Sequence, residues 1–395
     1  MSIHPTQYSA GRRTASRVFL ADAVSEILSI PAAVPAAPDL AGRFLSSIAA
    51  AIDRLMVGAA KMVIDRTVMP TPDETDAMRR QAEFYRTREL IADPRGFFPF
   101  LDRPEPVPDV VVAPLEPGPW NRRRARLVFE SPYRPVNPAF AAEHDRLVEN
   151  HWVHAETWTH AVRPRGTVVL LHGFGMGGSR LDALALMAPA LFASGLDVVL
   201  VTLPLHGMRS PRTARFSGQL FASPDIVRLN ETMAQAAHDV VALVAWLRSL
   251  SDAPIGLLGM SLGGYVAALM AGLMPDLDFV IPVVAPVCFG DLAHRFMSSS
   301  AVYRDRPSRG LDREELRSAY RIHSPLTHAP RVARERLCII AARGDRIVPH
   351  EHSRWLETHW NHPRTIWFTG SHLAPFGRAT VRREIRRFLQ DLDVL

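Results

Sequence analysis

The segment Gly259-Met260-Ser261-Leu262-Gly263 constrains the fold more than any other part of this 395-residue chain. An apolar run, Ile255 to Leu258, precedes the segment, and a small-residue helical pattern follows it through Ala271. This order predicts a strand, a tight turn and a helix. Glycine on both sides of the serine lets the backbone bend sharply, so we expect the hydroxyl of Ser261 to stand clear at the strand's carboxyl end.

Short apolar runs alternate with helical stretches throughout the chain after Gly166. Strands are predicted at Thr167–Leu171, Asp197–Leu203, Ile255–Gly259, Phe279–Val284, Leu337–Ala341 and Thr365–Phe368, after two earlier candidates at Ala125–Glu130 and Trp152–Ala161. Strands that are apolar along their whole length are typical of a parallel sheet with both faces covered. The pattern therefore favours an α/β fold with a mostly parallel central sheet flanked by helices.

The first 120 residues have a different character, and we assign residues 1–120 to an N-terminal helical and proline-rich appendage and 121–395 to the main domain. Asp39 is the expected N-cap of a long amphipathic helix, whose apolar positions are Leu40, Phe44, Ile48, Ile52, Leu55, Ala59 and Met62. We expect this stripe to pack against the rest of the protein, with a membrane-surface or partner-docking helix as the alternative. The proline-rich stretch from Pro94 to Pro138 predicts an extended connector.

A long gap separates the sixth and seventh predicted strands of the main domain. Residues 286–335 fill it, and Asp312 with Glu315 predicts a capping-box start to a short helix there. An insertion at this place would lie above the carboxyl edge of the sheet, near Ser261. It is a candidate lid.

An unactivated serine hydroxyl is a poor nucleophile, so Ser261 needs a base, and the base needs an orienting carboxylate. In sheets of this kind the acid and the histidine follow the serine in chain order, each in a loop after a later strand. Asp345 follows the strand predicted to end at Ala341, and His372 follows the next one. Asp291, after an earlier strand, remains the alternative acid.

Four motifs in this order give the chain from about residue 125 a family resemblance. They are the segment Gly259–Gly263, the acid loop Gly344–Pro349, the histidine loop Gly370-Ser371-His372, and the turn His172–Gly178. The chain resembles the α/β-hydrolase superfamily, and Pro204–Gly207 makes it similar to the esterase and dienelactone-hydrolase-like branch. The resemblance does not extend to the first 120 residues, to which we assign no family.

The resemblance implies a serine hydrolase that cleaves a carboxylic ester through an acyl-enzyme, without a metal or other cofactor. Ser261 attacks the acyl carbonyl, His372 transfers the proton and Asp345 orients the imidazole. The oxyanion is expected to meet the backbone N–H of Leu262 and that of Phe174 or Gly175. His172 is expected to brace its turn. A thioesterase or acyltransferase is the nearest alternative, and a non-catalytic binding protein of the same fold is an alternative of another class.

The loop from His206 to Arg215 is a candidate substrate-binding segment because it follows a strand at the edge where ligands bind. Its arginines, among them Arg209 and Arg212, have the chemistry to hold a carboxylate or phosphate. We therefore expect His206, Arg209 and Arg212 to contact an anionic part of the substrate.

Composition and charge indicate which classes of partner this chain is suited to bind. The net charge of +6 comes from arginines interspersed with 40 acidic residues, which does not favour a nucleic-acid protein. The apolar stretch from Ile48 to Ile64 is interrupted by Asp53, Arg54 and Lys61 and is not a membrane span. Two cysteines inside apolar runs are compatible with a reducing compartment, so we expect a cytoplasmic protein. Its expected partner is a small acyl substrate. The sequence does not decide whether the protein forms a homo-oligomer.

Overall fold

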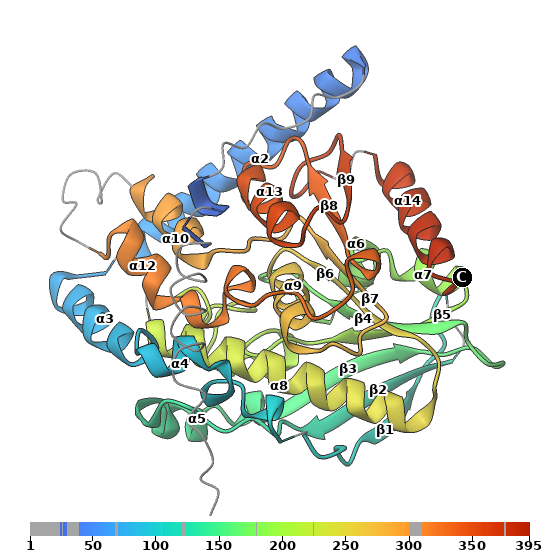
Figure 1. Cartoon of the computed structure of the whole chain (residues 1–395), viewed down its shortest axis with the longest axis horizontal. Coiled ribbons are helices and arrows are strands. Elements are labelled where there is room, and N and C mark those ends of the chain that lie inside the picture. The colour runs from blue at the N-terminus through green and yellow to red at the C-terminus, as the bar shows by residue number, and fades with distance from the viewer. Residues whose placement is uncertain are drawn as a thin grey trace, which may run out of the picture.

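A nine-stranded sheet lies at the centre of the protein in a computed structural model, which describes residues 24–25, 27–29, 39–67, 70–103, 105–120, 123–178, 180–223, 225–299, 310–374 and 377–395 (Figure 1). The strand order is β1-β2-β3-β5-β4-β6-β7-β8-β9. The strands are β1 (Val111–Leu115), β2 (Arg124–Glu130), β3 (Trp152–Trp158), β4 (Gly166–Leu171), β5 (Leu196–Val201), β6 (Ile255–Met260), β7 (Phe279–Val283), β8 (Cys338–Ala342) and β9 (Arg364–Phe368).

Strand β1 pairs antiparallel with β2, β2 with β3, and β3 with β5, whereas β4 to β9 form a parallel array. This confirms the mostly parallel sheet. Every predicted strand is present within three residues of its expected bounds. The structure adds β1, which pairs with β2 and lies ahead of the predicted boundary at residue 120.

Helices cover the two faces of the sheet and meet it through alternate side chains of the same strands. Val169 and Leu171 of β4 belong to a core cluster with the helices α8 and α9. Val168 and Leu170 belong to a second cluster, with α6, α7 and α14. The larger helices are α2 (Leu40–Thr67), α3 (Pro72–Tyr85), α8 (Ile226–Leu250), α9 (Leu262–Leu273), α10 (Phe289–Ser298), α13 (His350–His359) and α14 (Arg378–Asp391). The short ones are α4 (Arg88–Ala92), α5 (Ala141–Arg146), α6 (Arg180–Ala185), α7 (Ala188–Ala193) and α12 (Arg313–Ala319).

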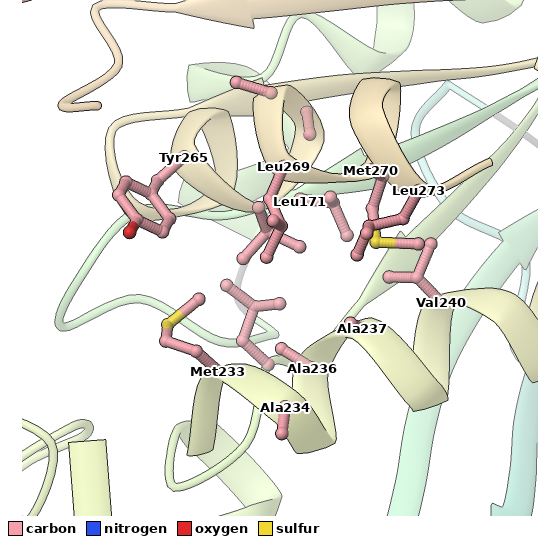
Figure 2. Close-up of a cluster of buried hydrophobic side chains, with 14 of the residues drawn as sticks. Leu171, Met233, Ala234, Ala236, Ala237, Val240, Tyr265, Leu269, Met270 and Leu273 are labelled. Atoms are coloured by element: carbon pink, nitrogen blue, oxygen red, sulfur yellow. The ribbon is translucent and has the colours of Figure 1, made fainter. Parts of the chain in front are cut away.

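Helix α9 follows the serine and is buried along its whole length. Figure 2 shows its side chains Leu269, Met270 and Leu273 above those of α8, where Ala236 and Ala237 leave room for them. Small residues on one helix and larger ones on the other allow such close interdigitation. The helix that begins at the serine is therefore held rigidly against both the sheet and α8.

The described residues ahead of position 120 share this core. Tyr85, Phe97 and Phe98 are fully buried in the cluster that contains α8 and α9. The hydroxyl of Tyr85 donates to Glu231 of α8 at 2.8 Å. With β1 in the sheet as well, the described residues on the two sides of position 120 share one core cluster and one sheet, and the division at residue 120 stays a prediction.

Helix α2 is present as predicted, but with a different face turned inward. Asp39 Oδ1 accepts the N–H of Gly42 at 2.6 Å, as an N-cap does. From Leu40 to Leu55 the predicted apolar stripe faces outward, with Leu40 80%, Phe44 66% and Leu55 74% exposed. The expectation that the stripe packs on the protein is therefore wrong for this part, and the side chains of Ala59 and Met62 lie outside the described residues. The buried side is made of small residues and of Asp53, and one end of α2 projects beyond the rest of the molecule (Figure 1).

The capping box that begins α12 is confirmed, since Asp312 and Glu315 accept one another's backbone N–H groups at 2.8 Å. Residues 300–309 of the predicted 286–335 insertion lie outside the described residues, and its role as a lid stays a prediction. Within the described part of the chain, no helix is both long and apolar enough to cross a bilayer.

Candidate active site

The turn between β6 and α9 holds Ser261 in a backbone conformation that side chains rarely adopt, with φ 54° and ψ −115°. Glycine is required on both sides of it. A Cβ on Gly259 would lie 2.0 Å from the carbonyl oxygen of Gly263, and a Cβ on Gly263 would lie 2.0 Å from that of Leu171. The predicted strand, sharp turn and helix are therefore present, and the serine stands at the carboxyl end of β6.

The structure brings Ser261, His372 and Asp345 together in one hydrogen-bonded row. His372 Nδ1 lies 2.8 Å from Asp345 Oδ2, and His372 Nε2 lies 2.9 Å from Ser261 Oγ. The other carboxylate oxygen of Asp345 accepts the N–H groups of Ile347 at 2.9 Å and Val348 at 2.8 Å. Because both oxygens of Asp345 accept, Nδ1 must donate, and Nε2 is left to accept the proton of the serine.

The imidazole of His372 is nearly removed from solvent, with 6% of the side chain exposed. Burial alone would lower its pKa, but the charge and hydrogen bond of Asp345, joined by the charge of Asp53, outweigh burial and raise the pKa above its ordinary value. An imidazole tuned in this way is a stronger base than a free one.

Asp291, the alternative acid, is committed elsewhere. It lies in the first turn of α10 and accepts hydrogen bonds from Arg313 and, at 2.9 Å, from Nε of Arg317, both on α12. Burial would raise the pKa of Asp291, yet these two arginines outweigh it and lower the pKa. This side chain ties α10 to α12, and the carboxylate that contacts His372 is that of Asp345.

The glycine-rich turn after β4 passes beside the serine. A Cβ on Gly173 would lie 3.5 Å from that of Ser261. His172 braces the turn as expected, with Nδ1 2.8 Å from the carbonyl oxygen of Gly173 and Nε2 accepting the N–H of Leu203 at 3.0 Å. Leu262 is the first residue of α9, so its N–H precedes the helix's own hydrogen-bond ladder.

The far end of this turn is fixed by Asp182, whose Oδ2 accepts the N–H groups of Gly177 at 2.7 Å and Gly178 at 2.6 Å. Phe174 and Gly175, between the two anchored ends, are exposed. The oxyanion-binding role predicted for Leu262 and for Phe174 or Gly175 stays a prediction.

The three predicted substrate-binding residues have different environments. Arg209 is fully buried and donates to Asp239 at 2.7 Å and to the carbonyl oxygen of Asn150 at 2.9 Å. The expectation that it contacts an anionic substrate is therefore wrong, because its charge is neutralised inside the protein. His206 is also fully buried, and burial lowers its pKa to about 3, so it offers no charge to an anion. Arg212 is 94% exposed, and its substrate contact stays a prediction.

One residue beside the site escaped the sequence reasoning. Asp53, from α2, is fully buried and accepts hydrogen bonds from the loops that carry the acid and the histidine. The only signal in the sequence was a carboxylate, next to Arg54, in an otherwise largely apolar stretch, and such a pattern is equally typical of a solvent-facing position of a helix.

Comparisons with known proteins place the chain among related sequences and folds. Residues 168–383 match the profile described as "Alpha/beta hydrolase family". The uncharacterized protein Rv2627c of Mycobacterium tuberculosis (strain ATCC 25618 / H37Rv) is 31% identical over 320 residues, which cover 79% of this chain and 74% of that protein.

Two solved structures share the fold at low sequence identity. Acetyl xylan esterase 1 from Thermoanaerobacterium sp. JW/SL YS485 has a TM-score of 0.53 and 14% identity, over 84% of this chain and 98% of that one. An acetyl xylan esterase from Paenibacillus sp. R4 has a TM-score of 0.52 and 13% identity, over 73% of this chain and 90% of that one.

Proposed function

Because this chain belongs to the alpha/beta hydrolase family, we propose that it is a serine hydrolase that cleaves carboxylic esters through Ser261, His372 and Asp345. The observation that carries the proposal is the unbroken row of hydrogen bonds from the carboxylate to the serine, 2.8 Å and then 2.9 Å long. A nucleophile, its base and an orienting acid in this relation are the diagnostic arrangement for covalent acyl transfer.

The reaction begins when Ser261 Oγ attacks the carbonyl carbon of the ester and its proton passes to His372 Nε2. The tetrahedral adduct then collapses, the carbon–oxygen bond to the alcohol breaks, and His372 gives the proton to the departing oxygen. A water molecule repeats the sequence on the acyl-enzyme, with the same imidazole taking its proton, and releases the acid. Asp345 keeps Nδ1 protonated and stabilises the imidazolium in each half of the cycle.

The negative charge that develops on the carbonyl oxygen needs donors that are in place beforehand. The N–H of Leu262, at the start of α9, and one from Phe174 or Gly175 would supply them. Loss of one such donor typically costs about 3 kcal/mol of transition-state stabilisation. The neighbouring helix N-terminus adds a favourable partial charge.

A protein of this fold that only binds a ligand does not need Ser261, His372 and Asp345 in this hydrogen-bonded arrangement. The arrangement therefore favours an enzyme. A thioesterase or an acyltransferase shares the acyl-enzyme and differs only in the leaving group or in the second nucleophile. Product analysis with ester and thioester substrates, with and without an added alcohol, separates these activities.

Labelling with a fluorophosphonate tests the proposal directly, because the probe reacts with an activated serine. We expect the wild type to be labelled and to hydrolyse p-nitrophenyl esters, and Ser261→Ala and His372→Ala to do neither. Ser249→Ala, which removes an exposed hydroxyl bonded only to the carbonyl oxygen of Trp246, is the matched control and should behave as wild type. A folded wild type that is neither labelled nor active on esters or thioesters would refute the proposal.

A further inference from the structure

We propose that Asp53 of helix α2 is a positioning residue of the active site, which holds the acid and the histidine in register; this inference rests on the proposed function. The acid loop is Gly344–Pro349, and the histidine loop, which begins at Gly370, continues through Ala374. Both loops follow parallel strands at the carboxyl edge of the sheet, and α2 comes from a distant part of the chain to join them.

Both carboxylate oxygens of Asp53 accept hydrogen bonds from these loops, and Oδ2 bridges the two. Oδ2 accepts the N–H of Arg346, next to the acid, and the N–H of His372 itself, each at 3.0 Å. Oδ1 accepts the hydroxyl of Ser371 at 2.7 Å and the N–H of Leu373 at 3.2 Å.

All four partners of Asp53 are donors. The Ser371 oxygen already accepts the N–H of Ala374 at 3.1 Å, which leaves its proton for Asp53. A group that only accepts hydrogen bonds is an ionised carboxylate, and charge-assisted bonds of this kind are about twice as strong as neutral ones.

The backbone segments around the Asp53 carboxylate are closely packed, so a shift of this carboxylate would displace both loops. Gly344 of the acid loop donates to the carbonyl oxygen of Gly370 in the histidine loop at 2.9 Å. A Cβ on Gly344 would lie 2.7 Å from the carbonyl oxygen of Ser46 and 3.3 Å from the Cβ of Ala49. Helix α2 therefore lies directly on the junction of the two loops, and small residues on both sides allow that approach.

The orientation of α2 argues that this contact is more than ordinary packing. A helix held by apolar burial turns its hydrophobic stripe toward the core. Helix α2 leaves Leu40, Phe44 and Leu55 exposed and turns a carboxylate inward. Burying a charge is costly unless it is fully hydrogen-bonded, and here every bond goes to the two catalytic loops.

Asp53 also acts on the imidazole through its charge. Among the described residues, the charges that act on His372 are those of Asp345 and Asp53, and both raise its pKa. Removal of the Asp53 charge should therefore lower the pKa of His372, whereas a merely structural contact would leave that pKa unchanged.

The test compares Asp53→Asn with wild type in the full-length protein. We measure the rate constant of fluorophosphonate labelling, and kcat and KM for a p-nitrophenyl ester, between pH 5 and 9. We expect kcat to fall about tenfold to a hundredfold, since small displacements of catalytic groups have effects of that size. The acidic limb of the labelling profile should move to lower pH, because the variant lacks one of the charges that raise the pKa of His372. Its midpoint is independent of the fraction of the variant that is folded.

Asp39→Asn is the matched control, because it makes the same change on the same helix and keeps a residue that caps helices. We expect this variant to have the kcat, the labelling rate constant and the acidic limb of the wild type. If Asp53→Asn yields no folded protein, Ser371→Ala removes one donor to the carboxylate and should lower kcat several-fold.

The inference would be overturned if folded Asp53→Asn had the kcat of wild type and the same acidic limb in its labelling profile. An unchanged kcat in Ser371→Ala would also overturn it. In both cases the proposed function would stand. An inert and unlabelled wild type would instead refute the proposed function, and the inference with it.

Discussion

The guanidinium of Arg209 lies 2.7 Å from the carboxylate of Asp239, and neither side chain is more than 2% exposed. The ion pair joins the loop after β5 to α8. The guanidinium also donates to the carbonyl oxygens of Thr202 at 3.2 Å and Asn150 at 2.9 Å, and Asp239 accepts the hydroxyl of Ser131 at 2.6 Å. The pairing and the added hydrogen bonds offset the cost of burying the two charges, and removal of either partner would leave the other charge buried and uncompensated.

Arg209→Ala should therefore destabilise the protein by about 3–5 kcal/mol, because it leaves Asp239 charged and buried. Arg212→Ala makes the same change three positions later at a 94% exposed side chain and should alter stability by less than about 0.5 kcal/mol. Chemical denaturation of both variants measures the difference. Equal stabilities would contradict the structural role assigned to Arg209.

The pH dependence of ester hydrolysis follows from the pKa of His372. The imidazole must be neutral to accept the serine proton, so kcat/KM should fall as the pH drops through the pKa of the free enzyme. Because that pKa is raised, the acidic limb should lie above the value of about 6.5 for a free imidazole. A pH–rate profile checks this, and activity that persists unchanged to pH 5 would rule out His372 as the base.

Asp345→Asn and Asp291→Asn distinguish the two carboxylates that the sequence left as alternatives. In Asp345→Asn the amide can donate to Nδ1, which places the imidazole proton on Nε2 and blocks acceptance from Ser261. We expect kcat to fall about 10⁴-fold with stability largely kept.

Asp291→Asn should show the reverse, because it removes the charge that Arg313 and Arg317 share between α10 and α12. Its unfolding midpoint should fall while kcat stays near wild type. The opposite pattern in the two variants would reassign the acid.

Most of the sheet could be predicted from the sequence because its strands are short, almost wholly apolar and bounded by turns. The strand pattern also indicated where the candidate catalytic residues lie, because parallel strands have their carboxyl ends at the same edge of the sheet. Ser261, Asp345 and His372 each follow such a strand, and local sequence is enough to place them there. Strand β1 (Val111–Leu115) is harder to predict because its residues are largely exposed and it lies in a proline-rich stretch.

The face of α2 could not be predicted because helical periodicity identifies an apolar stripe but not what the stripe meets. The partner of this helix is a pair of loops with free donor groups, so a carboxylate was turned inward and the apolar residues outward. Arg209 was misassigned for a similar reason. Its place in a loop at the carboxyl edge of the sheet does not reveal whether an acidic residue elsewhere will neutralise its charge. Here Asp239, which lies 30 positions later on α8, does so.

The bonds of Asp53 to the histidine loop span 318 to 320 residues, and this separation bears on how the protein acquires activity during synthesis. Chains are made from the N-terminus, and a domain of this topology cannot close its sheet until the late strands have emerged. Helix α2 and the Ser261 turn are therefore made well before the segment that supplies the base. A partly synthesised chain would carry the proposed nucleophile without its proposed base, so hydrolytic competence should arise as one of the last events of folding.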